Sequence, residues 1–144
     1  MEKYSGRVLA LDYGDSRIGV AVSDPNQIIC TPLPFVKNDS NSMVLIQAIL
    51  TEYEPTVIFI GDPINLDGSD SASQVKVDNF IAGLIEFGIK VPIIKIDERR
   101  STKAATQFLQ ASGNNSMTSK GKVDSAAAAM ILEMGISRFG SNEK

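Results

Sequence analysis

The chain has 144 residues, a length that suits one domain over residues 1–144, and its 43% hydrophobic and 22% charged residues are typical of a globular protein. It contains no histidine, which excludes imidazole general bases, Ser-His triads and imidazole zinc sites, so catalysis must depend on carboxylates, lysine, tyrosine or bound metal. The net charge of −3 argues against tight non-specific nucleic-acid binding, and the single cysteine, Cys30, excludes an internal disulfide and is expected in the core.

Two β-strands are predicted near the N-terminus, over residues 7–13 and 17–23. Only three turn-forming residues separate them, which indicates an antiparallel hairpin. Asp12 lies at the end of the first strand and shares a face with Ala10. A carboxylate held on a rigid strand end suits a hard metal ion, although an acid before a glycine such as Gly14 is also common in ordinary turns.

Residues 28–36 predict a third strand, and the two prolines within it favour an edge position or a bulge. A helix should follow, capped by Ser40 or Asn41 and ended by Pro55. Its apolar stripe is expected to consist of Val44, Leu45, Ala48 and Ile49.

Two continuous apolar runs, residues 56–61 and 91–97, predict strands that are buried within the sheet. Three further helices are predicted over residues 71–87, 102–111 and 123–138, with an apolar-poor, flexible segment at 113–122. A starting meander followed by strand–helix units predicts an α/β fold with a mixed five-stranded sheet flanked by helices.

Two more acids are placed where they could complete a site with Asp12. Glu98 follows a strand and shares a face with Ile96, although a charged residue there is also typical of a solvated strand exit. Asp124 opens the predicted last helix, where an acid complements the helix dipole, but it shares a face with Ala128 and so should point toward the sheet. Four successive small side chains, residues 126–129, would let this helix approach the sheet closely.

Carboxylates from two strand ends and one helix are what a two-metal phosphodiester site requires. Such a site holds Mg²⁺ or Mn²⁺ and leaves positions open for water and phosphate, and it needs no histidine. The pattern therefore predicts two ions bound by Asp12, Glu98 and Asp124, which would be both the catalytic and the metal-ligating residues.

One part of this acidic chain is basic. Residues 99–123 contain five Lys and Arg residues and no Asp or Glu, so this span carries +5 and the rest of the chain −8. A solvated helix face and loop would account for such a strip, but it also offers phosphate contacts. The predicted nucleic-acid-binding residues are Arg99, Lys103, Lys120 and Lys122.

Four ordered segments, spread over about residues 7–135, resemble the motifs of the YqgF/RuvX family. They are Leu11-Asp12-Tyr13-Gly14 with the strand that follows, Gly61-Asp62-Pro63 with Asp67-Gly68, Asp97-Glu98-Arg99 with Thr102 and Ala105, and Val123-Asp124 with Ala127-Ala128. The resemblance implies an RNase H-like nuclease domain related to the resolvase RuvC, with Asp12, Glu98 and Asp124 as metal ligands. The family usually has leucine at the position of Asp62, so this extra acid could join the site or repel phosphate.

Members of this family are described as nucleases for the 5′ end of pre-16S rRNA and as Holliday junction resolvases. We therefore expect a cytoplasmic, Mg²⁺- or Mn²⁺-dependent hydrolase of phosphodiester bonds that acts on structured RNA in ribosome biogenesis, as a monomer or weak homodimer without membrane contact. The alternatives are a resolvase of branched DNA and a non-catalytic RNA-binding factor of ribosome assembly. An actin-like ATPase also begins with a similar strand pair, but that fold needs two lobes and this chain is too short.

Overall fold

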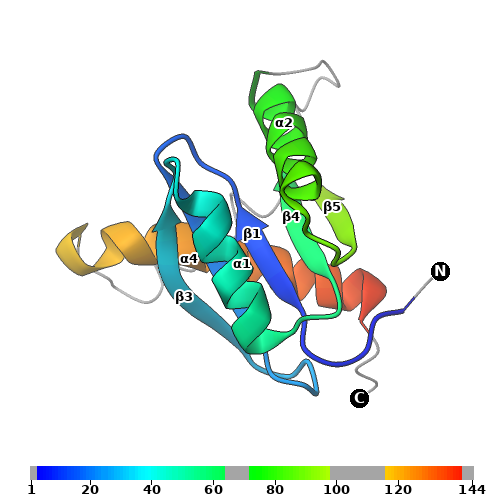
Figure 1. Ribbon diagram of the computed structural model, residues 1–144. Helices are drawn as coiled ribbons and strands as arrows, with labels where there is room; N and C mark the ends of the chain where they lie inside the picture. Colours follow the sequence, from blue (N-terminus) through cyan, green and yellow to red (C-terminus); the bar gives the residue numbers. More distant parts are fainter. Residues whose placement is uncertain (1–2, 64–71, 98–115, 141–144) are drawn as a thin grey trace.

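The computed structural model describes residues 3–63, 72–97 and 116–140, and the side chains of the last range from residue 126 onward (Figure 1). Five strands and three helices lie in these ranges. The strands are β1 (Leu9–Asp12), β2 (Arg17–Ser23), β3 (Cys30–Lys37), β4 (Ile58–Asp62) and β5 (Ile93–Asp97). The helices are α1 (Ser42–Tyr53), α2 (Ala72–Phe87) and α4 (Ser116–Phe139).

The five strands form one mixed sheet in the order β3-β2-β1-β4-β5. β1 pairs antiparallel with β2, and β2 pairs antiparallel with β3, so the predicted hairpin and meander are confirmed. β1 pairs parallel with β4, and β4 pairs parallel with β5. The carboxyl ends of β1, β4 and β5 therefore meet at the same edge of the sheet, with β1 in its centre.

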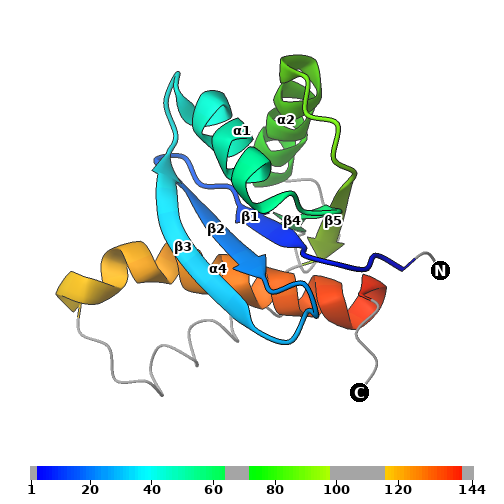
Figure 2. The ribbon, with the colours of Figure 1, turned by 60° about the horizontal axis from the view of Figure 1, so that its bottom comes forward.

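Helices cover both faces of the sheet. Figures 1 and 2 show α1 and α2 side by side on one face, whereas α4 crosses the opposite face and contacts all five strands. Alternate residues along the strands point to opposite faces of the sheet. Leu9 and Ile58 pack toward α1 and α2, and Val8 and Phe59 pack toward α4. Among the helices that the structure describes, none is long and apolar enough to cross a membrane.

The edge position predicted for the proline-containing strand is confirmed. β3 lies at one edge of the sheet, and its register against β2 shifts between Ile18 and Val20. Pro32 stands opposite Ala21, where an edge strand tolerates the missing N–H donor. Cys30 begins this strand and is only partly buried, and burial together with the charge of Glu133 raises the pKa of its thiol to about 11.

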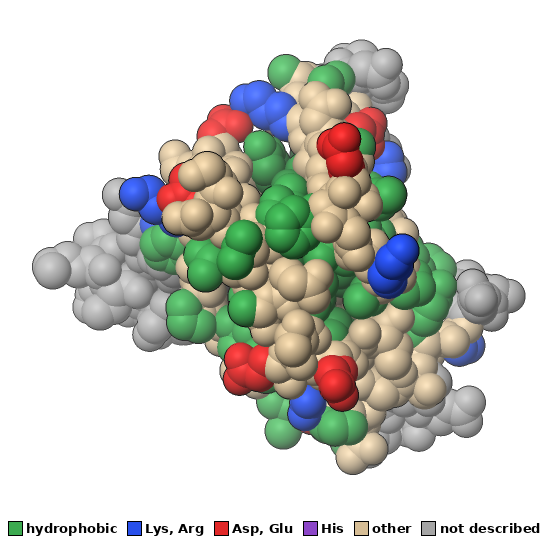
Figure 3. Space-filling view, viewed as in Figure 1, with side chains coloured by type: hydrophobic (Ala, Val, Ile, Leu, Met, Phe, Trp, Pro, Cys, Tyr) green, Lys and Arg blue, Asp and Glu red, His purple; other side chains and the backbone are tan. Residues whose placement is uncertain are grey.

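The apolar stripe predicted for α1 was wrong. Figure 3 shows hydrophobic side chains on the surface over α1. Val44 and Leu45 are 58% and 45% exposed, whereas Ser42, Ile46 and Leu50 are buried. The helix is rotated relative to the prediction because Ile46 and Leu50 pack against the sheet, with Ile49 only partly buried. A helix that is apolar over much of its circumference does not reveal its buried face by periodicity alone.

Two further expectations are corrected. α4 begins at Ser116, so residues 116–122 are helical and not a flexible segment. β5 is an edge strand in which only Ile96 is fully buried. The prediction that residues 91–97 form a strand buried within the sheet was therefore wrong. The helix predicted over 102–111 lies outside the described residues.

Candidate functional site

Asp12 ends the central strand of the sheet and is partly buried. Ala10, two residues earlier, belongs to the apolar layer that packs on α4, so Asp12 lies on the α4 face of the sheet. Leu11 is paired with Ile60 in β4, which makes Gly61 the next position beside Asp12. The neighbouring strand therefore places no side chain next to the Asp12 carboxylate on this face.

Two other acids end the parallel strands beside β1. Asp62 and Asp97 are Cα partners at the ends of β4 and β5. Ile60 and Ile58 precede Asp62 at alternate positions and pack on the α1–α2 layer, so Asp62 faces α2, away from Asp12. Among the residues that the structure describes, the Oδ1 atom of Asp62 is buried without a hydrogen-bond partner.

A lysine of β5, beside these acids, forms an ion pair with a residue of α2. The Nζ atom of Lys95 donates to Asp78 Oδ1 over 2.9 Å. This bond raises the pKa of Lys95, and the charge of Asp62 adds to the effect. The arrangement leaves Asp62 on a side of the sheet that is separate from the face on which Asp12 lies.

The other predicted site residues fall outside the part of the chain described in full. Glu98, Arg99 and Lys103 lie outside the described residues. Asp124, Lys120 and Lys122 lie in α4, where the helix is described but the side chains are not. Within the described ranges no three Asp, Glu or Cys side chains are grouped closely enough to hold a metal ion.

The position of Asp124 within its helix differs from the prediction. Because α4 begins at Ser116, Asp124 lies more than two turns inside it, and the first turn contains no acid. The helix dipole therefore does not account for Asp124. One turn later, Ala128 is fully buried against the sheet, and Ile131 and Leu132 follow on the same layer.

A cleft that the sequence did not reveal opens between the β1–β2 turn, the end of β4 and α2. It has a volume of about 160 Å³ and is lined by Tyr13, Asp15, Pro63, Ser73, Lys76 and Val77. These residues come from three segments, and only their positions in the fold bring them together. No local sequence pattern indicated the cleft, because Lys76 follows Asp15 by 61 positions.

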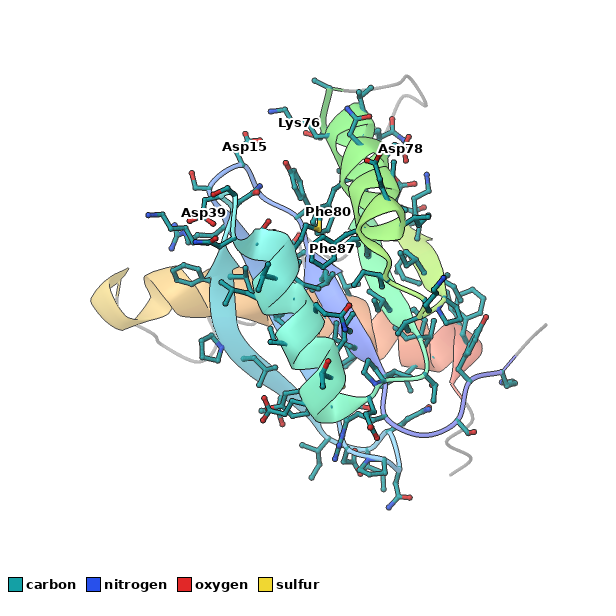
Figure 4. All side chains as sticks on the ribbon, viewed as in Figure 1. Asp15, Asp39, Lys76, Asp78, Phe80 and Phe87 are labelled. Carbon is teal, nitrogen blue, oxygen red and sulfur yellow. The ribbon has the colours of Figure 1, made fainter. Side chains whose placement is uncertain are left out.

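An ion pair spans the rim of this cleft. Lys76 Nζ lies 2.9 Å from Asp15 Oδ1, and the two side chains are 50% and 72% exposed. The hydrogen bond from Lys76 to Asp15 raises the pKa of Lys76. Figure 4 shows Lys76 reaching from α2 toward Asp15. Tyr13 packs against Phe80, with ring centroids 4.8 Å apart.

The residues at the end of β1 fit a divalent metal. Carboxylate oxygen is the ligand that Mg²⁺ and Mn²⁺ prefer, and Asp12 is held on a central strand paired on both sides. Asp62 does not contribute from the same side, since it faces α2. α4, which covers this face of the sheet, contains Asp124, and Glu98 follows β5 directly in the sequence.

Solved structures share this fold. RuvC of T. thermophilus, in complex with a Holliday junction substrate, aligns with a TM-score of 0.58 over 92% of this chain and 95% of that one, at 14% identity. The large terminase nuclease from thermophilic phage G20c aligns with a TM-score of 0.55 over 96% of this chain and 86% of that one, at 13% identity. At these identities the likeness establishes the fold, and the predicted RNase H-like sheet is confirmed.

Curated relatives match nearly the whole chain. A protein of Ruminiclostridium cellulolyticum named "Putative pre-16S rRNA nuclease" is 36% identical over 96% of this chain and 99% of its own length. A protein of the same name from Escherichia coli is 40% identical over 90% of this chain and 94% of its own length. The sequence profile of the family described as "RuvX: Holliday junction resolvase" matches residues 6–138. These matches, which agree with the sheet order and the carboxylate at the end of β1, show that the chain belongs to the RuvX family.

Proposed function

We propose that this protein is a metal-dependent nuclease that hydrolyses phosphodiester bonds in maturation of the 5′ end of pre-16S rRNA, in the cytoplasm. The observation that carries the proposal is the position of Asp12, at the end of the central strand on the face covered by α4. The name shared by the curated relatives supports rRNA as the substrate.

The proposed catalytic carboxylates are Asp12, Glu98 and Asp124. Asp12 would bind metal from the strand end, where packing on both sides limits its movement. Glu98 is included because Ile94 and Ile96 pack on the α4 layer and it continues their alternation in the sequence. Asp124 is included because it precedes the buried Ala128 by one helical turn.

Mg²⁺ or Mn²⁺, bound as two ions, supplies the positive charge that activates water and stabilises a leaving oxygen in phosphodiester hydrolysis. The protein's part is to hold its carboxylates in place. No histidine is present to act as a base, so the chain relies on acids for this chemistry.

The proposed contacts to the nucleic-acid backbone are Arg99, Lys103, Lys120 and Lys122. They belong to the one span of the sequence that is basic and free of acids. Charge reversal at all four should weaken binding and flatten its salt dependence, whereas an unchanged salt slope would contradict this assignment.

A second candidate keeps the same site but takes branched DNA as substrate. It is favoured by the description of the family, Holliday junction resolvase, and by the fold shared with RuvC. A resolvase must cut two symmetric strands, so it should act as a dimer, whereas the rRNA nuclease is expected as a monomer or weak homodimer. Gel filtration with and without a four-way junction separates the two candidates.

The experiment that tests the proposal compares cleavage of a pre-16S rRNA 5′ fragment and of a four-way DNA junction, with Mg²⁺, Mn²⁺ or EDTA. Asp12→Asn and Asp124→Asn should abolish cleavage, while Glu52→Gln, an exposed acid on α1, should retain it. Cleavage of the RNA alone, lost in both variants, supports the rRNA nuclease. Equal cleavage by wild type and Asp12→Asn would refute it, and RNA binding without any cleavage would favour the non-catalytic assembly factor.

A further inference from the structure

The cleft beside α2 lies directly next to the proposed catalytic strand end. Tyr13, which lines it, follows Asp12 in the chain, so the two Cα atoms are about 3.8 Å apart. Asp12 lies on the α4 face, whereas Tyr13 packs on the α1–α2 layer and against Phe80. A polymer that passes over this edge of the sheet would therefore meet Asp12 and the cleft within one or two of its units.

The lining of the cleft combines groups that suit one unit of a nucleic acid. Tyr13 supplies an aromatic wall, Ser73 a hydroxyl and Lys76 an ammonium group. A volume of about 160 Å³ is smaller than the roughly 300–1,000 Å³ of pockets that enclose a drug-sized molecule. The cleft is therefore too small to enclose a drug-sized molecule, but it can hold a part of a longer chain.

We propose that this cleft holds a nucleotide next to the cleaved bond, with the ammonium group of Lys76 contacting its phosphate and Tyr13 lining the space for the remainder. The inference rests on the proposed nuclease function and adds a substrate contact to it. Lys76 lies on α2, outside the basic span of residues 99–123, so it is a phosphate contact separate from that span.

The ion pair between Lys76 and Asp15 is suited to exchange with a phosphate. Both side chains are at least half exposed, and exposed pairs of this kind contribute little to stability. A phosphate that enters the cleft can take the place of the Asp15 carboxylate on Lys76 without disturbing buried structure. Asp15 is then a competitor for the same cation, which gives the two partners of one salt bridge opposite effects on binding.

A second ion pair, between β5 and α2, provides a matched control. Lys95 and Asp78 are also 2.9 Å apart and are 44% and 58% exposed. Asp78 lies two positions after Lys76, which places the two residues on opposite sides of the helix, as Figure 4 shows. Neither Lys95 nor Asp78 lines the cleft.

The test measures fluorescence anisotropy of a labelled pre-16S rRNA 5′ fragment with Ca²⁺ in place of Mg²⁺. Lys76→Met should weaken binding by about three- to tenfold near 0.1 M KCl and reduce the slope of log Kd against log salt by about 0.7–1. Lys95→Met and Asp78→Asn should leave both quantities unchanged. Asp15→Asn should tighten binding. In the Lys76→Met background it should do so much less, because the ammonium group with which the Asp15 carboxylate pairs is then absent.

Equal binding by Lys76→Met and wild type, or equal losses in Lys76→Met and Lys95→Met, would overturn the inference, as would weaker binding by Asp15→Asn. The unfolding temperature of each variant shows whether its fold is intact, and Lys76→Gln takes the place of Lys76→Met if that variant fails this check. The cleavage assay with Asp12→Asn decides the nuclease function separately. If cleavage depends on Asp12 but binding does not change in Lys76→Met, the nuclease function is supported and the cleft is not part of the substrate-binding site.

Discussion

Gly135 of α4 lies directly against the ring of Phe59 in β4. A Cβ atom built on Gly135 would come within 2.6 Å of the Cγ and Cε2 atoms of that ring. Phe59 is fully buried, so its ring has no space into which it can move. The absence of a side chain at Gly135 is therefore what allows α4 to lie close to the centre of the sheet, and Ala126 and Ala128 extend the same close approach.

We expect Gly135→Ala to lower the free energy of unfolding by about 1–3 kcal/mol, because overpacking against a buried ring costs more than the helix gains from alanine. Chemical denaturation of the variant and the wild type measures this difference. A rise in stability would show that the helix can move away from Phe59 without loss.

Gly83→Ala in α2 is the matched control for that substitution. Its Cβ would meet only Met43 Cε, at 3.2 Å, which is the far end of a flexible side chain. The helix propensity of alanine should then dominate and raise the free energy of unfolding by up to about 1 kcal/mol.

Ser23 satisfies a backbone group that the sheet leaves unpaired. Its buried Oγ accepts a hydrogen bond from the N–H of Val8 over 3.0 Å and donates to the carbonyl oxygen of Asp24 over 2.9 Å. Ser23→Ala removes the acceptor and should cost about 1–3 kcal/mol. Ser137→Ala, on the exposed side of α4, should change the free energy of unfolding by less than about 0.5 kcal/mol in the same denaturation experiment.

Asp24 makes stability depend on pH. Backbone N–H groups of Ile29, Ile28 and Asn26 donate to its carboxylate, the bond from Ile29 having the largest effect, and they hold the pKa of Asp24 below its ordinary value of 3.8. A lowered folded-state pKa stabilises the fold above the unfolded-state pKa, and this stabilisation is lost as the pH falls through the folded-state value. The difference in free energy of unfolding between wild type and Asp24→Asn should be constant above about pH 5 and shrink below about pH 4. A difference that does not change with pH would contradict this role.

Asp62 should be dispensable for metal binding, and it should lower the free energy of unfolding. Its Oδ1 atom is buried without a partner among the described residues, and the residue faces α2. Asp62→Leu should raise the free energy of unfolding by about 1 kcal/mol, because it removes an unsatisfied buried group. Cleavage activity with Mg²⁺ should be retained, and its loss would place Asp62 in the catalytic site.

Removal of the metal should expose the role of Asp12 without an activity assay. A ligand that binds only the folded state at 100 times its Kd stabilises it by about 2.7 kcal/mol. Mg²⁺ or Mn²⁺ should therefore raise the unfolding temperature of the wild type by several degrees, and EDTA should reverse the shift. Asp12→Asn should lose this response, and Glu52→Gln should keep it; an equal shift in wild type and Asp12→Asn would exclude Asp12 as a ligand.

Much of the fold could be read from local patterns. The tight turn after β1, the two prolines of β3 and the apolar run of β4 each constrain only a few neighbouring residues, and each was interpreted correctly. Alternation along the first strand predicted that Asp12 shares a face with Ala10, and the structure shows that Ala10 packs in the α4 layer. The full site stays a prediction, since Glu98 and Asp124 are linked to Asp12 by their places in the sequence pattern and by the family's motifs, and not by a described contact.

Predictions failed where the answer depended on what an element packs against. Val44 and Ile46 are both apolar residues of α1, and only the position of the helix on the sheet decides that Ile46 is buried and Val44 exposed. The seven residues before Val123 contain two lysines and little that is apolar, yet they continue α4, because a helix can extend with polar residues once its later turns are anchored.

The sequence by itself determined the order of the strands along the chain, the strand-end carboxylate and the exclusion of imidazole chemistry, because these depend on residue type and short-range periodicity. Only the tertiary structure decided that Asp62 has a buried oxygen without a partner among the described residues, that Gly135 must lack a side chain, and that Lys76 meets Asp15 across 61 positions. The physical reason is that each of these depends on the distance between elements that are far apart in the sequence. That distance is set by the packing of the whole core and not by any local preference.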